Sequence, residues 1–163
     1  EKPLFKSRLT KVLKDVLGLG SDEKTTTALE TFQQKDFSGK RVLLVEDNEL
    51  NIEVATELLD VVGIQVESAV NGRLAVNRVL ENAPGYYDLI FMDIQMPVMN
   101  GYEATGIIRS SDREDLATIP IIAMTADAFA DDIRKSEKAG MNGHISKPVD
   151  IKKLEDALSA WIK

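Results

Sequence analysis

The sequence predicts an α/β fold in which a parallel sheet of five strands is covered by helices on both faces. From Arg41 onward, short apolar runs alternate with longer segments whose apolar residues recur at helical spacing, a pattern typical of repeated β-then-α units. Most connections are short, so consecutive strands are expected to run parallel. Hydrophobic residues make up 44% of the 163 residues, which fits a globular domain with a well-filled core.

Each expected strand is a short apolar run bounded by turn residues. The clearest is Val42 to Val45, whose β-branched and leucine side chains are all apolar and therefore indicate a strand buried on both faces. The other expected strands cover residues 64–70, 87–94, 120–124 and 143–146.

The expected helices are marked by capping residues. Asn48 can cap a helix that runs to about Val62 and stops at Gly63. Asn71-Gly72 is expected to be a turn before the next helix, which continues to Pro84-Gly85. Later helices are expected over 101–110, over 129–139 and from a cap at 150 to the last residue.

Residues 1–39 have a different pattern. Apolar residues recur at helical spacing within residues 1–17, whereas residues 18–39 are mostly polar and are expected to form a linker. Lys2-Pro3-Leu4 resembles Lys147-Pro148-Val149, and an amphipathic segment follows each. Residues 1–17 are therefore either the tail of a preceding domain of the same kind or an ordinary connector helix. We expect a fragment of a longer protein, with its folded domain at 40–163.

Composition excludes several function classes. The net charge of −7 argues against a nucleic-acid partner, because no broad basic face is available for phosphates. The chain has no cysteine, which excludes disulfides and thiolate metal sites. No apolar run approaches the roughly 20 residues that cross a bilayer. We therefore expect a cytoplasmic location without membrane contact, although the parent protein could be membrane-anchored.

Carboxylates stand at the carboxyl ends of two expected strands. Glu46 and Asp47 follow the first strand, and Asp93 closes the apolar part of the third. Ligands of parallel α/β sheets bind beyond these strand ends, and three clustered carboxylates repel one another unless a cation joins them. Such oxygen ligands suit Mg²⁺ or Mn²⁺, to which the Gln95 carbonyl could add a ligand. The alternative is that Glu46 and Asp47 only cap the first helix.

Two further polar residues end the fourth and fifth strands. Lys147 could hold Asp93 ionised or pair with a phosphate, and Thr125 supplies a hydroxyl donor. A carboxylate nucleophile, a divalent metal, a lysine and a hydroxyl are what phosphoryl acceptance requires. The alternatives are a surface lysine and an ordinary β-branched strand residue.

Four motifs occur in the order and spacing of one family. They are Val42 to Asn48, Met92 to Gly101, Met124-Thr125-Ala126 and Ser146-Lys147-Pro148. Together they make residues 40–163 resemble a receiver domain of two-component signalling. A receiver that follows a long linker, with Phe37-Ser38-Gly39-Lys40 leading into the first strand, most resembles that of a hybrid sensor histidine kinase. The resemblance implies a flavodoxin-like (βα)5 fold with strand order 2-1-3-4-5.

The resemblance also implies residue roles. Asp93 would be the phosphoacceptor, with Mg²⁺ held by Glu46, Asp47, Asp93 and the Gln95 backbone carbonyl, while Thr125 and Lys147 would contact the phosphoryl oxygens. Thr125 would act as a switch together with the aromatic position of the fifth strand, which here is His144 instead of the usual Tyr or Phe. Gln95 and Asp127 match positions that tune phosphoryl lifetime.

A partner is expected to dock on the first helix. Leu50 and Val54 lie on a second apolar stripe there, which could receive the phosphotransfer helices of a histidine kinase or a histidine phosphotransfer protein. Broad burial in the core is the alternative, especially for Val54.

We expect a relay module that accepts a phosphoryl group rather than turning over a substrate. Three other functions are considered beside it. One is a receiver cut from a multi-domain response regulator, and another is a scaffold that is never phosphorylated. The third is an aspartyl phosphatase, which would need a second acid two residues after the nucleophile, where this chain has Gln95.

Overall fold

A computed structural model describes residues 37–126, 130–147, 149 and 151–162. The expected helix at 1–17 and nearly all of the linker at 18–39 lie outside these residues, as do Asp127 and the cap at Asp150. The proposed domain boundaries therefore stay a prediction.

The predicted sheet is confirmed, with five parallel strands in the order β2-β1-β3-β4-β5. The strands are β1 (Arg41–Val45), β2 (Gln65–Ala69), β3 (Leu89–Asp93), β4 (Ile121–Thr125) and β5 (Gly143–Ser146). Every residue of β3 and β4 is buried, because these strands lie inside the sheet and are covered on both faces. The apolar runs in the sequence reflect this two-sided burial.

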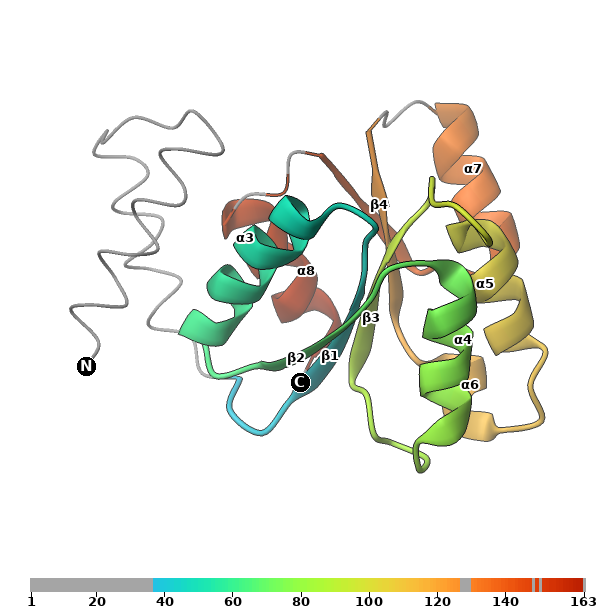
Figure 1. The fold of residues 1–163 in the computed structure, drawn as a ribbon, viewed down its shortest axis with the longest axis horizontal. Helices are drawn as coiled ribbons and strands as arrows, with labels where there is room; N and C mark the ends of the chain where they lie inside the picture. Colours follow the sequence, from blue (N-terminus) through green and yellow to red (C-terminus); the bar gives the residue numbers. More distant parts are fainter. Residues whose placement is uncertain (1–36, 127–129, 148, 150, 163) are drawn as a thin grey trace.

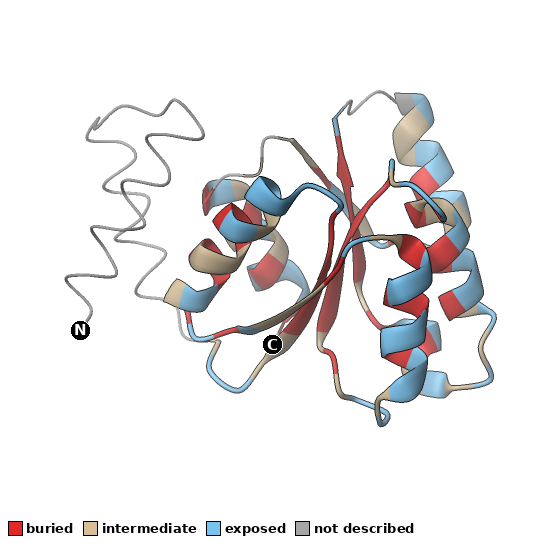
Figure 2. Ribbon diagram, in the orientation of Figure 1, coloured by how far each residue is buried: buried red, intermediate tan, exposed pale blue. Residues whose placement is uncertain are grey.

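Helices cover both faces of the sheet (Figure 1). One face carries α3 (Glu49–Val61) and α8 (Ile151–Trp161), and the other carries α4 (Gly72–Glu81), α5 (Gly101–Arg109), α6 (Glu114–Thr118) and α7 (Ala130–Ala139). Two apolar clusters fill the layers, one centred on Leu58, Phe91 and Leu158 and the other on Leu43, Ile90 and Ile108. Figure 2 shows the buried residues concentrated in the strands and on the helix sides that face them.

Most helix starts agree with the sequence, with two corrections. Asn48 caps α3, since its side chain accepts hydrogen bonds from the amides of Leu50 and Asn51 at 2.9 and 3.1 Å. Asn71-Gly72 is not a separate turn: Asn71 is the N-cap and Gly72 the first residue of α4. The short helix α6 was not expected, because its five residues carry no side-chain cap that could mark its start.

Within the described residues, no helix combines the length and the apolarity required to cross a bilayer.

Candidate functional site

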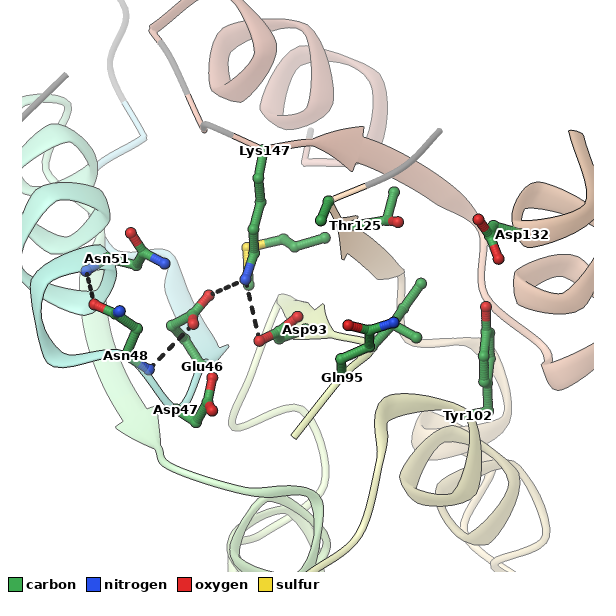
Figure 3. Close-up of a pocket in the computed structure, with 13 residues that line it drawn as sticks. Glu46, Asp47, Asn48, Asn51, Asp93, Gln95, Tyr102, Thr125, Asp132 and Lys147 are labelled. Atoms are coloured by element: carbon green, nitrogen blue, oxygen red, sulfur yellow. Dashed lines mark hydrogen bonds and ion pairs between the residues drawn. The ribbon is translucent and has the colours of Figure 1, made fainter. Parts of the chain in front are cut away.

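A cleft of about 320 Å³ opens at the carboxyl ends of the strands. Its walls combine side chains from all the strand-end motifs that the sequence analysis singled out. Its lining includes Glu46, Asp47, Asn51, Asp93, Gln95, Tyr102, Thr125, Asp132 and Lys147, all of which are labelled in Figure 3.

The three predicted carboxylates converge in this cleft. One oxygen from each of Glu46, Asp47 and Asp93 lies within 4.8 Å of the others. Glu46 and Asp93 are buried, with 2% and 4% of their surface exposed, whereas Asp47 is exposed at the rim. Glu46 does more than cap a helix: its Oε1 accepts the Asn48 amide at 3.1 Å, which leaves Oε2 directed toward the cleft.

Lys147 joins two of the acids and is not a free surface lysine. Its Nζ lies 2.9 Å from Glu46 Oε2 and 3.1 Å from Asp93 Oδ2, as the dashed lines in Figure 3 show. The backbone amide of Lys147 donates to the Thr125 carbonyl at 2.7 Å, which fixes the lysine beside the end of β4. One ammonium is thus shared between two buried carboxylates.

The charges in the cleft do not balance. Burial and the neighbouring Glu46 raise the pKa of Asp93 to about 6, although Lys147 acts in the opposite direction. Burial lowers the pKa of Lys147, but Glu46 and Asp93 outweigh it and the net shift is upward. Three acids against one ammonium leave an excess of negative charge that a divalent cation would neutralise. The all-oxygen donor set fits Mg²⁺.

The loop after Asp93 is held tightly against it. The Gly101 amide donates to the Ile94 carbonyl at 2.9 Å, and a Cβ on Gly101 would lie 2.4 Å from the Asp93 carbonyl oxygen. Only glycine fits there, which explains the Asn-Gly start of α5. Within the loop, the Met99 amide donates to the Pro97 carbonyl at 2.7 Å around Val98, whose φ is 69°. Such a tight γ-turn is strained for a β-branched residue.

Gln95 and Thr125 both line the cleft. Thr125 is buried at the end of β4, with 8% of its surface exposed. Gln95 follows Asp93 by two residues and is exposed. The metal-ligand, phosphoryl-contact and lifetime roles expected for these residues stay predictions.

Three predicted residues lie apart from the cleft. His144 is exposed on the edge strand β5 and is not among the cleft residues, so its switch role stays a prediction. Leu50 is 48% exposed at the start of α3 and is available to a partner. Val54 is 4% exposed and packs in the core, so its assignment as a surface docking residue is wrong. Its position on α3 turns it toward the sheet rather than outward.

Three cleft residues lie outside the four motifs, and the sequence predicted no role for them in the site. Tyr102 on α5 and Asp132 on α7 lie on the side of the cleft away from α3 (Figure 3), and Asn51 lies on the α3 side. Tyr102 and Asn51 each follow a recognised motif by one helical turn or less, which was the available signal. Asp132 comes from α7, and no motif marks it.

Comparisons with known proteins point to one protein family. The family model described as "Response regulator receiver domain" matches residues 42–159. The hybrid signal transduction histidine kinase L of Dictyostelium discoideum is 32% identical over 149 residues, which cover 91% of this chain and 9% of that protein. The chain therefore spans only a small part of this relative's length.

Two solved structures extend the comparison. The receiver domain of sensor histidine kinase PA1611 from Pseudomonas aeruginosa, with a magnesium ion coordinated in its active site cleft, is 39% identical with a TM-score of 0.68, covering 77% of this chain and 98% of that one. The Saccharomyces cerevisiae co-crystal structure of the phosphotransfer protein Ypd1 and the receiver domain of Ssk1 gives 36% identity and a TM-score of 0.69, covering 78% and 91%.

The acidic cleft is typical of receivers that accept phosphoryl groups. Because the family model covers most of the chain and both fold and cleft agree with it, this chain belongs to the response regulator receiver domain family of two-component signal transduction.

Proposed function

We propose that this receiver accepts a phosphoryl group on Asp93 from a phosphohistidine donor and relays it or switches in response. The observation that carries the proposal is the convergence of Asp93, Glu46 and Asp47 on one space, where the single ammonium of Lys147 leaves an excess of negative charge. A scaffold that binds partners only through helical faces would not need such unbalanced buried charge.

The transfer step uses the Asp93 carboxylate as nucleophile. One oxygen of Asp93 bonds to phosphorus while the phosphorus–nitrogen bond of the donor breaks, and the departing imidazole keeps the electron pair and takes up a proton. Lys147 lies close enough to Asp93 to pair with the new phosphoryl oxygens, and Thr125 lines the same cleft as a hydroxyl donor.

A Mg²⁺ ion held by Glu46, Asp47, Asp93 and the Gln95 carbonyl would offset the charge that builds up between the attacking carboxylate and the phosphoryl oxygens. The protein residues hold the reacting groups in place: Glu46 and Asp93 are buried, and Lys147 pairs with both of them, so little reorganisation is needed. Gln95 offers no carboxyl group where a phosphatase would need one, which favours a stored phosphoryl group over turnover.

The context we propose is a hybrid sensor histidine kinase in the cytoplasm. A matched relative is a hybrid histidine kinase, and a similar receiver was crystallised with a histidine phosphotransfer protein. Phosphotransfer helices that carry the donor histidine are the partner class we propose, with Leu50 as one contact.

Intact-mass measurement after incubation with acetyl phosphate and Mg²⁺ tests the acceptor. We expect the wild-type chain to gain the mass of one phosphoryl group, and Asp93→Asn to gain nothing. Removing Mg²⁺ with a chelator should abolish the gain. The matched control is Glu67→Gln, the same acid-to-amide change outside the cleft, which should keep the gain.

No gain in the wild-type chain would favour the scaffold function. An equal gain in Asp93→Asn would place the phosphoryl group on another residue.

A further inference from the structure

The cleft holds a fourth carboxylate that lies apart from the three acids described so far. Asp132, in the first turn of α7, lines the cleft together with Tyr102 of α5. Both side chains lie beyond Gln95 as seen from Asp93, and the Tyr102 hydroxyl points toward the Asp132 carboxylate (Figure 3). Asp132 does not belong to the group of three acids that converge on the proposed metal position. It is therefore available for another role.

The surroundings of Asp132 differ from those of the acid before it. Asp131 is in the same turn of α7, but its side chain is 87% exposed and lies 4.0 Å from Arg134. Asp132 is half-buried, and no described residue forms a hydrogen bond or an ion pair with its side chain. Both acids favour the start of the helix through its dipole, which does not explain why only Asp132 faces the cleft. The hydrogen-bond partners open to Asp132 are molecules that enter the cleft.

A phosphoryl group on Asp93 would extend toward this side of the cleft. The Lys147 Nζ lies 3.1 Å from Asp93 Oδ2, so that oxygen is already paired. The other oxygen, Oδ1, lies on the side of Gln95 (Figure 3) and is left to act as the nucleophile. Phosphorus bonded to Oδ1 would therefore face the part of the cleft that Tyr102 and Asp132 close.

Loss of the phosphoryl group to water has a defined geometry. Phosphoryl transfer proceeds roughly in line, so water attacks phosphorus from the side opposite the departing Asp93 oxygen. With phosphorus on Oδ1, that is the side of Tyr102 and Asp132. The cleft of about 320 Å³ has room for a phosphoryl group and several waters, each of which occupies about 30 Å³. A water molecule can therefore stand between Asp132 and the phosphorus.

We propose that Asp132 orients and deprotonates the water that hydrolyses the acyl phosphate of Asp93, and thereby sets the lifetime of the phosphorylated state. This inference rests on the proposed function. The water oxygen bonds to phosphorus while the phosphorus–oxygen bond to Asp93 breaks, and the Asp93 carboxylate keeps the electron pair. Asp132 takes a proton from the water and passes it to the departing phosphate. The Gln95 amide can hold the same water but cannot take up its proton.

The decay of the phosphorylated chain tests this role. The full chain is loaded with acetyl phosphate and Mg²⁺, the donor is removed by desalting, and the phosphorylated fraction is followed by intact mass. We expect Asp132→Asn to load as the wild-type chain does but to lose its phosphoryl group about tenfold more slowly, because an amide accepts no proton. The effect is at this low end because the loose transition state of phosphoryl transfer needs little help from a base.

Asp131→Asn is the matched control. It removes the same charge from the same turn of α7, at an exposed position, and should decay at the wild-type rate. An equally slow decay in Asp131→Asn would assign the effect to charge at the start of the helix and would overturn the proposal. Wild-type decay in Asp132→Asn would overturn it as well.

Hydrolysis in water enriched in heavy oxygen locates the attack. We expect the label in the released phosphate, whereas label in the protein would show attack on the Asp93 carbonyl carbon and overturn the proposal. A wild-type chain that gains no phosphoryl group overturns the proposed function and this inference with it. Normal loading with unchanged decay overturns the inference alone.

Discussion

Asp93 and Glu67 are two partly or wholly buried carboxylates whose surroundings have opposite effects. Glu67 on β2 accepts hydrogen bonds from the Tyr86 hydroxyl and, at 2.8 Å, from the Tyr87 hydroxyl. Arg78 and Arg41 lie 3.5 and 3.8 Å away. Burial raises the pKa of Glu67, but these donors outweigh it and the net shift is downward. The pKa of Asp93 instead rises to about 6.

The two pKa values shift in opposite directions because the two acids have different numbers of cationic and hydrogen-bond-donating neighbours. Glu67 has four such neighbours to itself, whereas Asp93 shares one ammonium with Glu46. A carboxylate with a full set of donors stabilises the fold. One with too few creates a site for a cation.

The sharpest test of this comparison replaces each acid by its amide. Without metal at pH 7, Asp93→Asn should raise the free energy of unfolding by about 1–3 kcal/mol, because it removes a charge that burial disfavours. Glu67→Gln should lower it by about 1–2 kcal/mol, since the charge-assisted hydrogen bonds are lost. Urea unfolding in the presence of a chelator measures both. Changes of the same sign would show that the two environments do not differ as described.

The next largest effect is expected in how metal-free stability and Mg²⁺ affinity depend on pH. The folded-state pKa of Asp93 lies above its unfolded value of 3.8, so metal-free stability falls as pH rises from about 4 to about 6. Mg²⁺ binding requires the ionised carboxylate, so its affinity should fall about tenfold (about 1.4 kcal/mol) from pH 7 to pH 5. Calorimetric titration measures this slope. Glu67→Gln should keep it, and an equally steep slope in Asp93→Asn would assign the proton to another group.

A smaller effect is expected from removing one donor of Glu67. Tyr87 is buried, and burial together with its hydrogen bond to Glu67 raises its pKa. Tyr87→Phe should cost about 1 kcal/mol of stability. Combined with Tyr86→Phe it should not be additive, because both hydroxyls serve one carboxylate. Additive costs in a double-mutant cycle would mean that the two hydroxyls act independently.

The smallest effect is expected from Arg78, at the exposed edge of the group of side chains around Glu67. The Arg78 side chain is 48% exposed, so Arg78→Ala should cost no more than about 0.5 kcal/mol and should cost less at high salt. Thermal unfolding at two salt concentrations checks this. A larger, salt-independent loss would show that Arg78 contributes through packing.

The sequence was most informative where signals are local. The apolar run of β1, the Asn48 cap and the polar residues at strand ends each depend on a few neighbouring positions, and the parallel topology then brings Glu46, Asp93 and Lys147 together. The resemblance supplied the strand order that the sheet confirms.

Features set by packing between distant elements were not predictable in the same way. The Glu67 cluster joins residues that lie 19 and 20 positions apart in sequence, and it depends on the register of an edge strand. Asp132 reaches the cleft only because of how α7 packs, and Val54 was misplaced because two adjacent apolar stripes on one helix do not reveal which faces the sheet. The short α6 lacks a capping signal.

The contact between Gly101 and the Asp93 carbonyl has a mechanical consequence. There is no room for even a methyl group between them, and the Gly101 amide donates to the Ile94 carbonyl, so the first turn of α5 packs directly against the backbone of Asp93. A change in bonding at the Asp93 side chain that shifts its backbone therefore displaces the start of a nine-residue helix.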